Sequence, residues 1–546
     1  MKKSGFGLLK RCPKTGKIVG YNADTLFGKI LFPLAGILAI AWFLFRVLPK
    51  PDRIAYPCQK VAMSVGGTFI TYLSALILSY PLFKGIGRIH KKAAYVSIFV
   101  LLVIGSTIVI LGSNDEPKEF IPDLTSAEGP NNPMGEGKGI FPGRVVWVQD
   151  FDATSWVEGN GYWWDDDNTD QAIADKMFEQ AILNITGESN SEEAWNKLFE
   201  YQNVIKGNGN RGYKKGEKIV FKVNVNPSGR PDQEWNDRGY PSPHMLNSMV
   251  KQLIEVAGVN GEDIILAEPS RYFTGPIYNK IRSNPSPEYR DIRFIDRKGK
   301  DISNHVGAQP DTNNVIYFNM PDGSKYKMCF PQCFTDADYI IDYSVFRPHS
   351  IFGITIAAKN HFGSVWDLTR NEFTPRDLHV FASNNKVAPN KHGDPHCSPV
   401  LLGHKTTKDK TMLYFADGLY TAINQGGKVQ RFSTMDNEWF SSLLISLDPV
   451  ALESVCYDFI ISENSLVVDN KSFNGNQESQ LHESAMAGRP ASGTVYDPEN
   501  DGTALESLGV HEHWNNAKDK LYSRNMGKNH GIELISIKPI SGTALN

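Results

Sequence analysis

The chain has 546 residues and 41% hydrophobic residues, so it is too long for one ordinary domain and long enough to bury a large core. Its net charge of -3 is unevenly spread, because residues 1–113 carry 15 Lys and Arg against Asp24 and Asp52, whereas the rest carries 42 basic and 58 acidic groups. A large acidic region without a basic stripe argues against nucleic acid as a partner, and we expect none.

Three apolar runs come first along the chain, Ile30–Leu48, Val61–Phe83 and Ala93–Leu111. Each is long enough to cross a hydrocarbon layer of about 30 Å as a helix. Buried core helices are the alternative, although three such runs in succession favour membrane spans. We therefore predict a tail over residues 1–28 and three transmembrane helices over residues 29–113, with the lipid bilayer as a partner.

The Lys and Arg residues around these runs predict their orientation. The tail and the loop between the second and third runs carry eleven of them, whereas the other side carries Lys50, Arg53 and Lys60. This bias places the tail and the second loop in the cytoplasm. The expected protein is therefore a multi-pass protein of the inner (cytoplasmic) membrane, whose part after Gly112 is extracytoplasmic or periplasmic.

A linker rich in Pro, Gly and Asn is expected over residues 114–142, before an α/β domain over residues 143–546. Arg144–Val148 is the first strand, and two helical patterns follow. Lys218–Val225, Pro243–Ala257 and Asp263–Ala267 then form a strand–helix–strand pattern, which predicts a mostly parallel sheet. Further strands are predicted at Asp291–Ile295, Tyr339–Phe346 and Leu443–Leu447, and a helix at Pro449–Ile461. From about residue 470 we expect a C-terminal extension with a long loop and a small closing lobe.

Six cysteines are present, and in an oxidising compartment some of them would pair. Cys329 and Cys333 form the C-x-x-x-C sequence CFPQC, which fits a disulfide or a free buried pair equally well. Their spacing does not match an iron–sulfur motif.

Polar side chains gather where predicted strands end, which is where open parallel sheets bind ligands. They are Lys222, Asn224 and Asn226, the run Glu268–Arg271, and Asp448. Asp448 before Pro449 is also typical of a helix N-cap. Lys222 in mid-strand needs either an ion-pair partner or a functional role.

The stretch His349–Trp366, HSIFGITIAAKNHFGSVW, places Lys359, Asn360 and His361 directly after an apolar run. That run suits a buried strand or a short core helix. A cation, an amide and an imidazole need partners if they are buried, so this stretch is either a binding segment or a polar turn that Gly363 closes. Asp417 in YFADGLY is a candidate acid, or part of a turn before a helix.

The sequences HGDPHC and HEH contain metal-ligand residue types, but their spacing matches no helical metal motif, and we predict no metal site. The sequence contains no G-x-S-x-G and no P-loop, and no G-x-G-x-x-G follows a strand.

Five segments, taken in chain order, resemble the family known as domain of unknown function 362, over about Gly143 to Ile461. They are FKVNVN, DIILAEPSR, RPHSIFGITIAAKNHFG, FADGLY and ISLDPVALESV. The resemblance points to a set of pattern positions, namely Lys222, Asn224, His349, Lys359, Asn360, Gly363, Asp417 and Asp448. Many relatives carry ferredoxin-type cysteine motifs, which implies redox work. This chain has no such motif, so the cofactor is left open.

Two classes of function are expected from these features. In the first, the domain is an enzyme or a cofactor-binding domain that acts on a small anionic ligand or in redox chemistry. His349, Lys359, Asn360 and Asp417 would then be catalytic, and Lys222, Asn224, Gly363 and Asp448 would bind the ligand. In the second, it is a membrane-anchored protein without catalytic activity, which has a binding or surface-organising role. The aromatic segment Trp156–Asp167 would then be a contact surface, or it is a packed flap.

Overall fold

The structure is a computed structural model that describes residues 9–11, 18–21, 40, 42 and 129–538, except 232, 301–303, 321–323, 351, 375, 382–392 and 468–477. The chain divides into two compact units, Met1–Lys118 and Glu119–Asn546. The predicted membrane spans and the loops that orient them lie outside the described residues. Within the described part, no helix has both the length and the apolar character needed to cross a membrane. In the first unit, β1 (Leu9–Arg11) pairs with β2 (Ile18–Tyr21).

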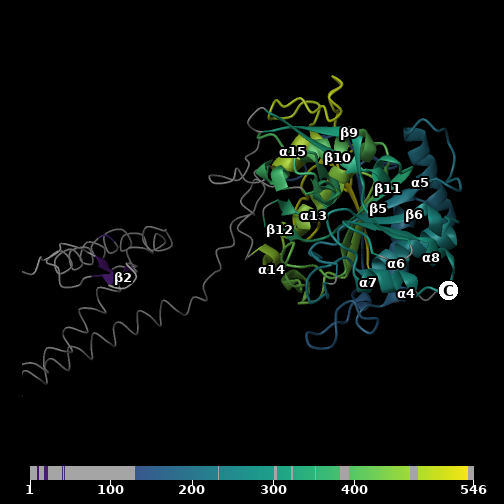
Figure 1. The fold of residues 1–546 in the computed structure, drawn as a ribbon, viewed down its shortest axis with the longest axis horizontal. Helices are drawn as coiled ribbons and strands as arrows, with labels where there is room; N and C mark the ends of the chain where they lie inside the picture. The colour runs from purple at the N-terminus through teal and green to yellow at the C-terminus, as the bar shows by residue number, and fades with distance from the viewer. Residues whose placement is uncertain are drawn as a thin grey trace, which may run out of the picture. The chain divides into compact units, whose positions relative to one another are not determined.

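A nine-stranded sheet forms the centre of the second unit, in the order β19-β4-β17-β16-β11-β5-β6-β7-β8 (Figure 1). Neighbouring strands are parallel except around β17, which runs antiparallel to both β16 and β4. This architecture confirms the mixed α/β class. The strands are β4 (Arg144–Gln149), β5 (Ile219–Val223), β6 (Ile264–Glu268), β7 (Arg293–Asp296), β8 (His305–Gly307), β11 (Tyr339–Val345), β16 (Thr411–Gly418), β17 (Ser442–Ser446) and β19 (Glu533–Ile537).

Two layers cover the sheet, one on each face (Figure 1). Side chains alternate along each strand, so Phe221 of β5 packs into one core while Val220 packs into the other. The first layer contains α4 (Gln171–Thr186), α5 (Ser191–Ile205), α6 (Pro243–Lys251), α7 (Gly275–Arg282) and α8 (Glu288–Asp291). The second contains α9 (Gln332–Thr335), α10 (Ala357–Asn360), α11 (Ser398–Gly403), α12 (Lys405–Lys408), α13 (Pro449–Ile461), α14 (Asn464–Val467) and α15 (Glu478–Ala485).

A small antiparallel sheet, which we did not predict, adds to the second layer. Its order is β15-β14-β10-β9, with β9 (Pro310–Asn319), β10 (Lys325–Pro331), β14 (Trp366–Asp367) and β15 (Glu372–Phe373). Buried residues such as Met328 and Phe330 of β10 belong to the same core as α13.

The predicted strand–helix–strand unit is present as β5, α6 and β6. Ser242 caps α6 by accepting from the Met245 amide, and Pro243 occupies the first turn, where its missing N–H costs nothing. The helix continues through a π-turn, Gln252–Val256, which accounts for the longer helix expected from the sequence. Because β5 and β6 are parallel neighbours, the crossover brings both of their carboxyl ends to one edge of the sheet.

The apolar run after His349 forms neither one strand nor one core helix. It folds instead into a hairpin of β12 (Pro348–His349) and β13 (Gly353–Ile354), followed by the single turn α10. Gly353 has a φ of +83°, which permits the tight reversal between the two short strands. The hairpin returns the chain to the sheet edge, so α10 lies beside β11.

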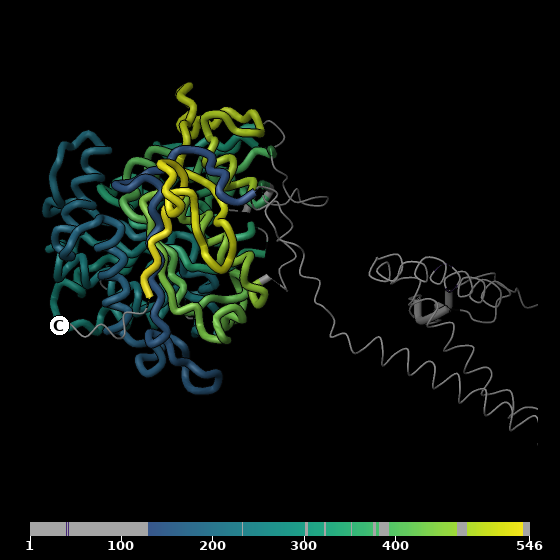
Figure 2. The backbone as a smooth tube through the Cα atoms, turned by 180° about the vertical axis from the view of Figure 1, so that it is seen from behind, coloured from purple at the N-terminus to yellow at the C-terminus, as the bar shows by residue number. Residues whose placement is uncertain are grey.

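The C-terminal region is part of the main domain and not a separate lobe. Its last strand, β19, pairs in parallel with β4, and Figure 2 shows this yellow segment running along the blue one. Next to it, β18 (Val510–His511) pairs with β3 (Met134–Gly135), so this part of the predicted linker packs on the domain.

The aromatic segment Trp156–Asp167 packs on the domain through its tryptophans, whereas Val157 and Tyr162 are exposed. Trp156 and Trp163 are buried, and their rings lie 5.6 Å from that of Trp439 and 5.1 Å from that of Tyr420. In the described part of the chain, Cys329, Cys333, Cys397 and Cys456 are free thiols.

Candidate functional site

A cavity of about 240 Å³ lies at the carboxyl ends of β5, β6 and β11. These three strands are adjacent and parallel, so their carboxyl ends meet at the same edge. Five predicted site residues line the cavity: Asn224, His349, Lys359, Asn360 and Gly363. The structure therefore brings these five predicted residues to one place, from segments far apart in the sequence.

Lys222 lies beneath the cavity, and its ammonium group is fully paired. Its Nζ is 2.9 Å from Oε2 of Glu268 and 2.9 Å from Oδ1 of Asn360, and it also donates to the Val223 carbonyl at 3.2 Å. Lys222 is 0% exposed and Glu268 is 2% exposed, so the pair is shielded from water. The position of Lys222 in mid-strand is thus explained by a buried ion pair.

Gly363 makes room for this ion pair. A Cβ at that position would lie 2.5 Å from Oε1 of Glu268, which is too close, and 3.1 Å from Nζ of Lys222, which is tight. The glycine expected to close a turn therefore has a packing role against the buried charges. No direct part in binding is needed to explain it.

A row of buried carboxyl groups continues inward from Asn360. Its Nδ2 donates to Oδ1 of Asp342 at 2.6 Å, and Oδ2 of the same carboxyl lies 3.2 Å from Nε2 of His361. Burial raises the pKa of Asp342 to about 7, and raises that of Glu453 on α13 to about 8. The carboxyl groups of Asp342 and Glu453, behind the cavity, are therefore protonated to a large extent near neutral pH.

Lys359 is the lysine that faces the cavity, and it differs from Lys222. Its Nζ lies 3.9 Å from the centroid of the Phe362 ring and makes no hydrogen bond or ion pair with any described residue. Burial lowers its pKa to about 7; the nearby Cys397 opposes this shift, and Arg271 adds to it. A large fraction of the amine is consequently neutral at physiological pH.

His349 lies on the same wall. The Phe352 amide donates to its Nδ1 at 3.1 Å, so the neutral ring carries its proton on Nε2. Burial, and then the neighbouring Lys359, hold the pKa of His349 well below its usual range. The ring of His379 is stacked against it at 6.2 Å.

Two arginines line the cavity: Arg271 belongs to the strand-end run Glu268–Arg271 noted in the sequence, whereas Arg347 was not predicted. Arg271, just beyond β6, donates from Nε to Asn226 Oδ1 at 3.0 Å and from Nη1 to the Ser270 carbonyl at 3.2 Å. Arg347, just beyond β11, is buried and donates to Asn224 and to the carbonyls of Asn226 and Gly239. The signal in the sequence was a basic residue within a few positions of a strand end, in EPSR and FRPH.

Asp417 does not face this cavity. It is the next-to-last residue of β16 and lies on the other face of the sheet, where it accepts from the Ser242 amide at 2.5 Å and from the Tyr343 hydroxyl at 2.8 Å. Burial raises the pKa of Asp417 to about 6. Asp417 therefore supports the start of α6, and it does not supply the counter-charge for Lys359. The expected turn before a helix is absent, since Asp417 belongs to a central strand.

Asp448 also lies away from this cavity. It follows β17, which is antiparallel to its neighbours and therefore ends at the opposite edge of the sheet. It is the N-cap of α13, with the Ala451 amide donating to Oδ1 at 2.9 Å. Oδ2 accepts from the amides of Lys138 and Val510. The Ala451 contact confirms the N-cap interpretation, and the other two contacts join Asp448 to neighbouring segments.

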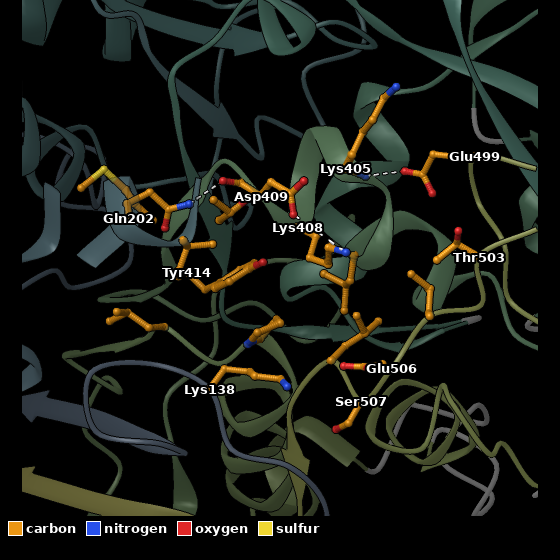
Figure 3. A pocket seen from close by; sticks show the side chains of 18 of the residues that line it. Lys138, Gln202, Lys405, Lys408, Asp409, Tyr414, Glu499, Thr503, Glu506 and Ser507 are labelled. Atoms are coloured by element: carbon orange, nitrogen blue, oxygen red, sulfur yellow. Dashed lines mark hydrogen bonds and ion pairs between the residues drawn. The ribbon is translucent and has the colours of Figure 1, made fainter. Parts of the chain in front are cut away.

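A larger cavity, of about 570 Å³, opens beside this opposite edge (Figure 3). Several of its polar groups bind one another: Gln202 donates to the Asp409 carbonyl at 2.6 Å, and the Lys405 amide donates to Glu499 at 2.6 Å. Apolar side chains such as Leu505 and Leu508 line the rest. Its size exceeds that of the first cavity, but it lacks a convergent set of buried charged side chains.

In the part of the chain that the structure describes, no group of three or more His, Cys, Asp or Glu side chains is arranged to hold a metal ion. The HEH sequence places His511 and His513 in the second core layer, where they donate to or accept from Ser454 and Asp458. Both histidines are buried.

Comparison with known proteins finds a similarity for the central part of the chain. Residues 222–458 match the family model described as Domain of unknown function (DUF362). No curated protein matches the chain. The matched region begins at Lys222 and extends into α13, so it contains the described residues that line the cavity at the ends of β5, β6 and β11.

Proposed function

We propose that the region similar to DUF362 binds a small anionic ligand in the cavity at the ends of β5, β6 and β11, and acts on it there. The observation that carries the proposal is the charge of the wall. Arg271, Arg347 and Lys359 line it, whereas Glu268 is the one acidic side chain among the described lining residues and is already paired with Lys222. An anion from outside would balance this excess.

The volume limits the size of the ligand. A cavity of about 240 Å³ has room for about eight water molecules at about 30 Å³ each. This space suits a short carboxylate or a phosphate, and it is below the range of about 300–1,000 Å³ typical of sites for drug-sized ligands. Planar guanidinium groups such as that of Arg271 match carboxylate and phosphate oxygens in geometry.

Calorimetric titration of the full-length chain with phosphate, oxalate and pyruvate tests the binding. We expect at least one of these anions to bind, and its affinity to fall with added salt because the contact is between charges. The Lys359→Met and Arg271→Gln variants should lose most of the affinity. Lys405→Met removes a lysine from the larger cavity and should leave the affinity unchanged. Equal affinity in all four proteins would refute the proposal.

The site of action is a separate part of the proposal. We propose that the three apolar runs hold the domain at the inner membrane on its extracytoplasmic side, as the eleven-to-three bias of Lys and Arg indicates. A thiol reagent that cannot cross membranes should label Cys58 in intact cells whose outer surface has been opened, and should leave Cys12 unlabelled. Labelling of Cys12 alone would reverse the orientation.

A further inference from the structure

We propose that the ligand carries a carbonyl group beside its carboxylate, and that Lys359 captures this carbonyl as an imine. This inference rests on the proposed anion binding and names the class of substrate, a short 2-oxo acid. It follows from the different surroundings of the two lysines at the cavity and from the donor of Arg271 that has no described partner.

The two lysines are suited to different tasks. Lys222 gives its ammonium hydrogens to Glu268, to Asn360 and to a backbone carbonyl, so its nitrogen has no lone pair to offer. Lys359 has no such partner among the described residues, and its amine stands over the Phe362 ring at the cavity wall. A nucleophilic amine requires the second situation.

The surroundings of Lys359 also keep its amine reactive. Burial lowers the pKa of Lys359 to about 7, and Arg271 and Lys222 contribute in the same direction. An unperturbed lysine with a pKa of about 10.4 would be neutral in less than about 0.1% of molecules at pH 7. A lysine whose pKa is near 7 is neutral in about half of them, so the free amine is roughly a thousand times more abundant.

Arg271 is placed to hold the carboxylate. Two of its donors are occupied by Asn226 and by the Ser270 carbonyl, which fixes the guanidinium plane. Its Nη2 has no hydrogen bond to a described residue. This leaves a donor of Arg271 at the cavity. Arg347 gives Nη1 to Gly239 and Nη2 to Asn224 and Asn226, and its Nε is buried without a hydrogen bond to a described residue.

His349 lines the same cavity. Since the Phe352 amide occupies Nδ1, the neutral imidazole presents N–H at Nε2. Its low pKa keeps the ring neutral, so it adds no further positive charge next to Lys359. A neutral imidazole N–H can stabilise the oxygen of a carbonyl as negative charge develops on it.

The step balances without a further reactant. The lone pair of Lys359 Nζ attacks the carbonyl carbon, a C–N bond forms, and the carbonyl π pair moves to the oxygen. One amine hydrogen then passes to that oxygen. The C–O bond breaks with transfer of the second amine hydrogen, and water leaves the imine. No electron is gained or lost from outside, and hydrolysis reverses the step.

Reductive trapping tests the inference. The full-length chain is incubated with pyruvate and cyanoborohydride, and the digested protein is analysed by mass spectrometry. We expect one reduced adduct, on the peptide that carries Lys359, and a rate that rises with pH through about 7. Lys359→Arg keeps the charge and should remove the adduct, whereas Lys405→Met should not change it. Arg271→Gln should slow trapping by about tenfold or more, the factor that corresponds to about 1.4 kcal/mol.

Oxamate, which has the shape and charge of pyruvate but an unreactive amide, separates this inference from the proposed binding. If oxamate binds and pyruvate leaves no adduct on Lys359, the imine is refuted and anion binding stands. If neither binds, the imine is refuted, and anion binding is refuted with it when phosphate and oxalate do not bind either. Adducts spread over exposed lysines, and unchanged in Lys359→Arg, would also refute the imine.

Discussion

Replacing Lys222 by Met should destabilise the domain strongly, because it removes one half of a buried ion pair. Glu268 would keep its contacts with the Ser270 amide and hydroxyl but lose its counter-charge, while it remains only 2% exposed. Asn360 would lose the donor to its Oδ1 at 2.9 Å. Leaving one charge of such a pair buried costs about 3–5 kcal/mol.

Urea unfolding followed by tryptophan fluorescence measures this cost as a lower midpoint at similar slope. The double variant Lys222→Met with Glu268→Gln removes both charges and should recover much of the loss, which a double-mutant cycle quantifies. Lys251→Met is a matched control, since Lys251 pairs with Asp175 at 2.8 Å but its side chain is 43% exposed. This change should cost about 1 kcal/mol or less.

A Lys222→Met variant within about 1 kcal/mol of the parent protein would refute the reasoning. It would mean that Glu268 takes up a proton or reaches water at little cost, and that the ion pair does not organise the floor of the cavity. An equal loss in Lys222→Met and in the double variant would refute it as well, because the cost would then come from the lost packing of the lysine stem.

Three further changes have expected outcomes. The folded protein keeps the proton of Glu453 up to about pH 8, whereas the unfolded chain releases it near pH 4.5. Because of this group, the free energy of unfolding falls as pH rises between these two values. Glu453→Gln should remove that fall, which urea unfolding at several pH values measures. Gly363→Ala should cost about 1–3 kcal/mol in the same assay and weaken anion binding, since its Cβ would displace Glu268. Asp448→Ala removes the acceptor of the Ala451 amide and should cost about 1–2 kcal/mol, without changing anion affinity in calorimetry.

Local patterns predicted much of the fold. The strand–helix–strand unit from Lys218 to Ala267 was found from the hydrophobic patterns of its two strands and of Pro243–Ala257, which depend on nearby residues alone. Parallel pairing follows from the length of the crossover. The lysine in mid-strand was also recognisable, because a buried ammonium group requires a partner wherever it occurs.

Long-range pairing explains what the sequence left open. The sequence of Ser442–Ser446 does not predict that β17 is antiparallel, because its direction depends on the strands with which it pairs. Its reversal carries Asp448 to the edge away from the cavity. In the same way, the two-residue strand β18 pairs with β3, which lies near the other end of the domain in sequence. No periodic pattern is visible in so short a segment.

Asp417 shows how the register of neighbouring strands decides a site. Within a strand, side chains alternate between faces, so Asp342 and Val345 of β11 point to opposite sides. Lys222 pairs across from Asp342, whereas Asp417 pairs across from Val345. The carboxylate is therefore on the α6 side of the sheet, and Lys222 is on the side of α10.

Because Asp417 lies on the other face, Lys359 has no carboxylate to lose when it is replaced. Its amine is held by burial beside the Phe362 ring, and removing a charge that is costly to bury should not destabilise the domain. Lys359→Met should thus keep the free energy of unfolding within about 1 kcal/mol of the parent protein, in contrast to the loss of about 3–5 kcal/mol expected for Lys222→Met. A fold that tolerates the loss of this lysine, while anion binding does not, would indicate that the counter-charge of Lys359 comes from a bound ligand.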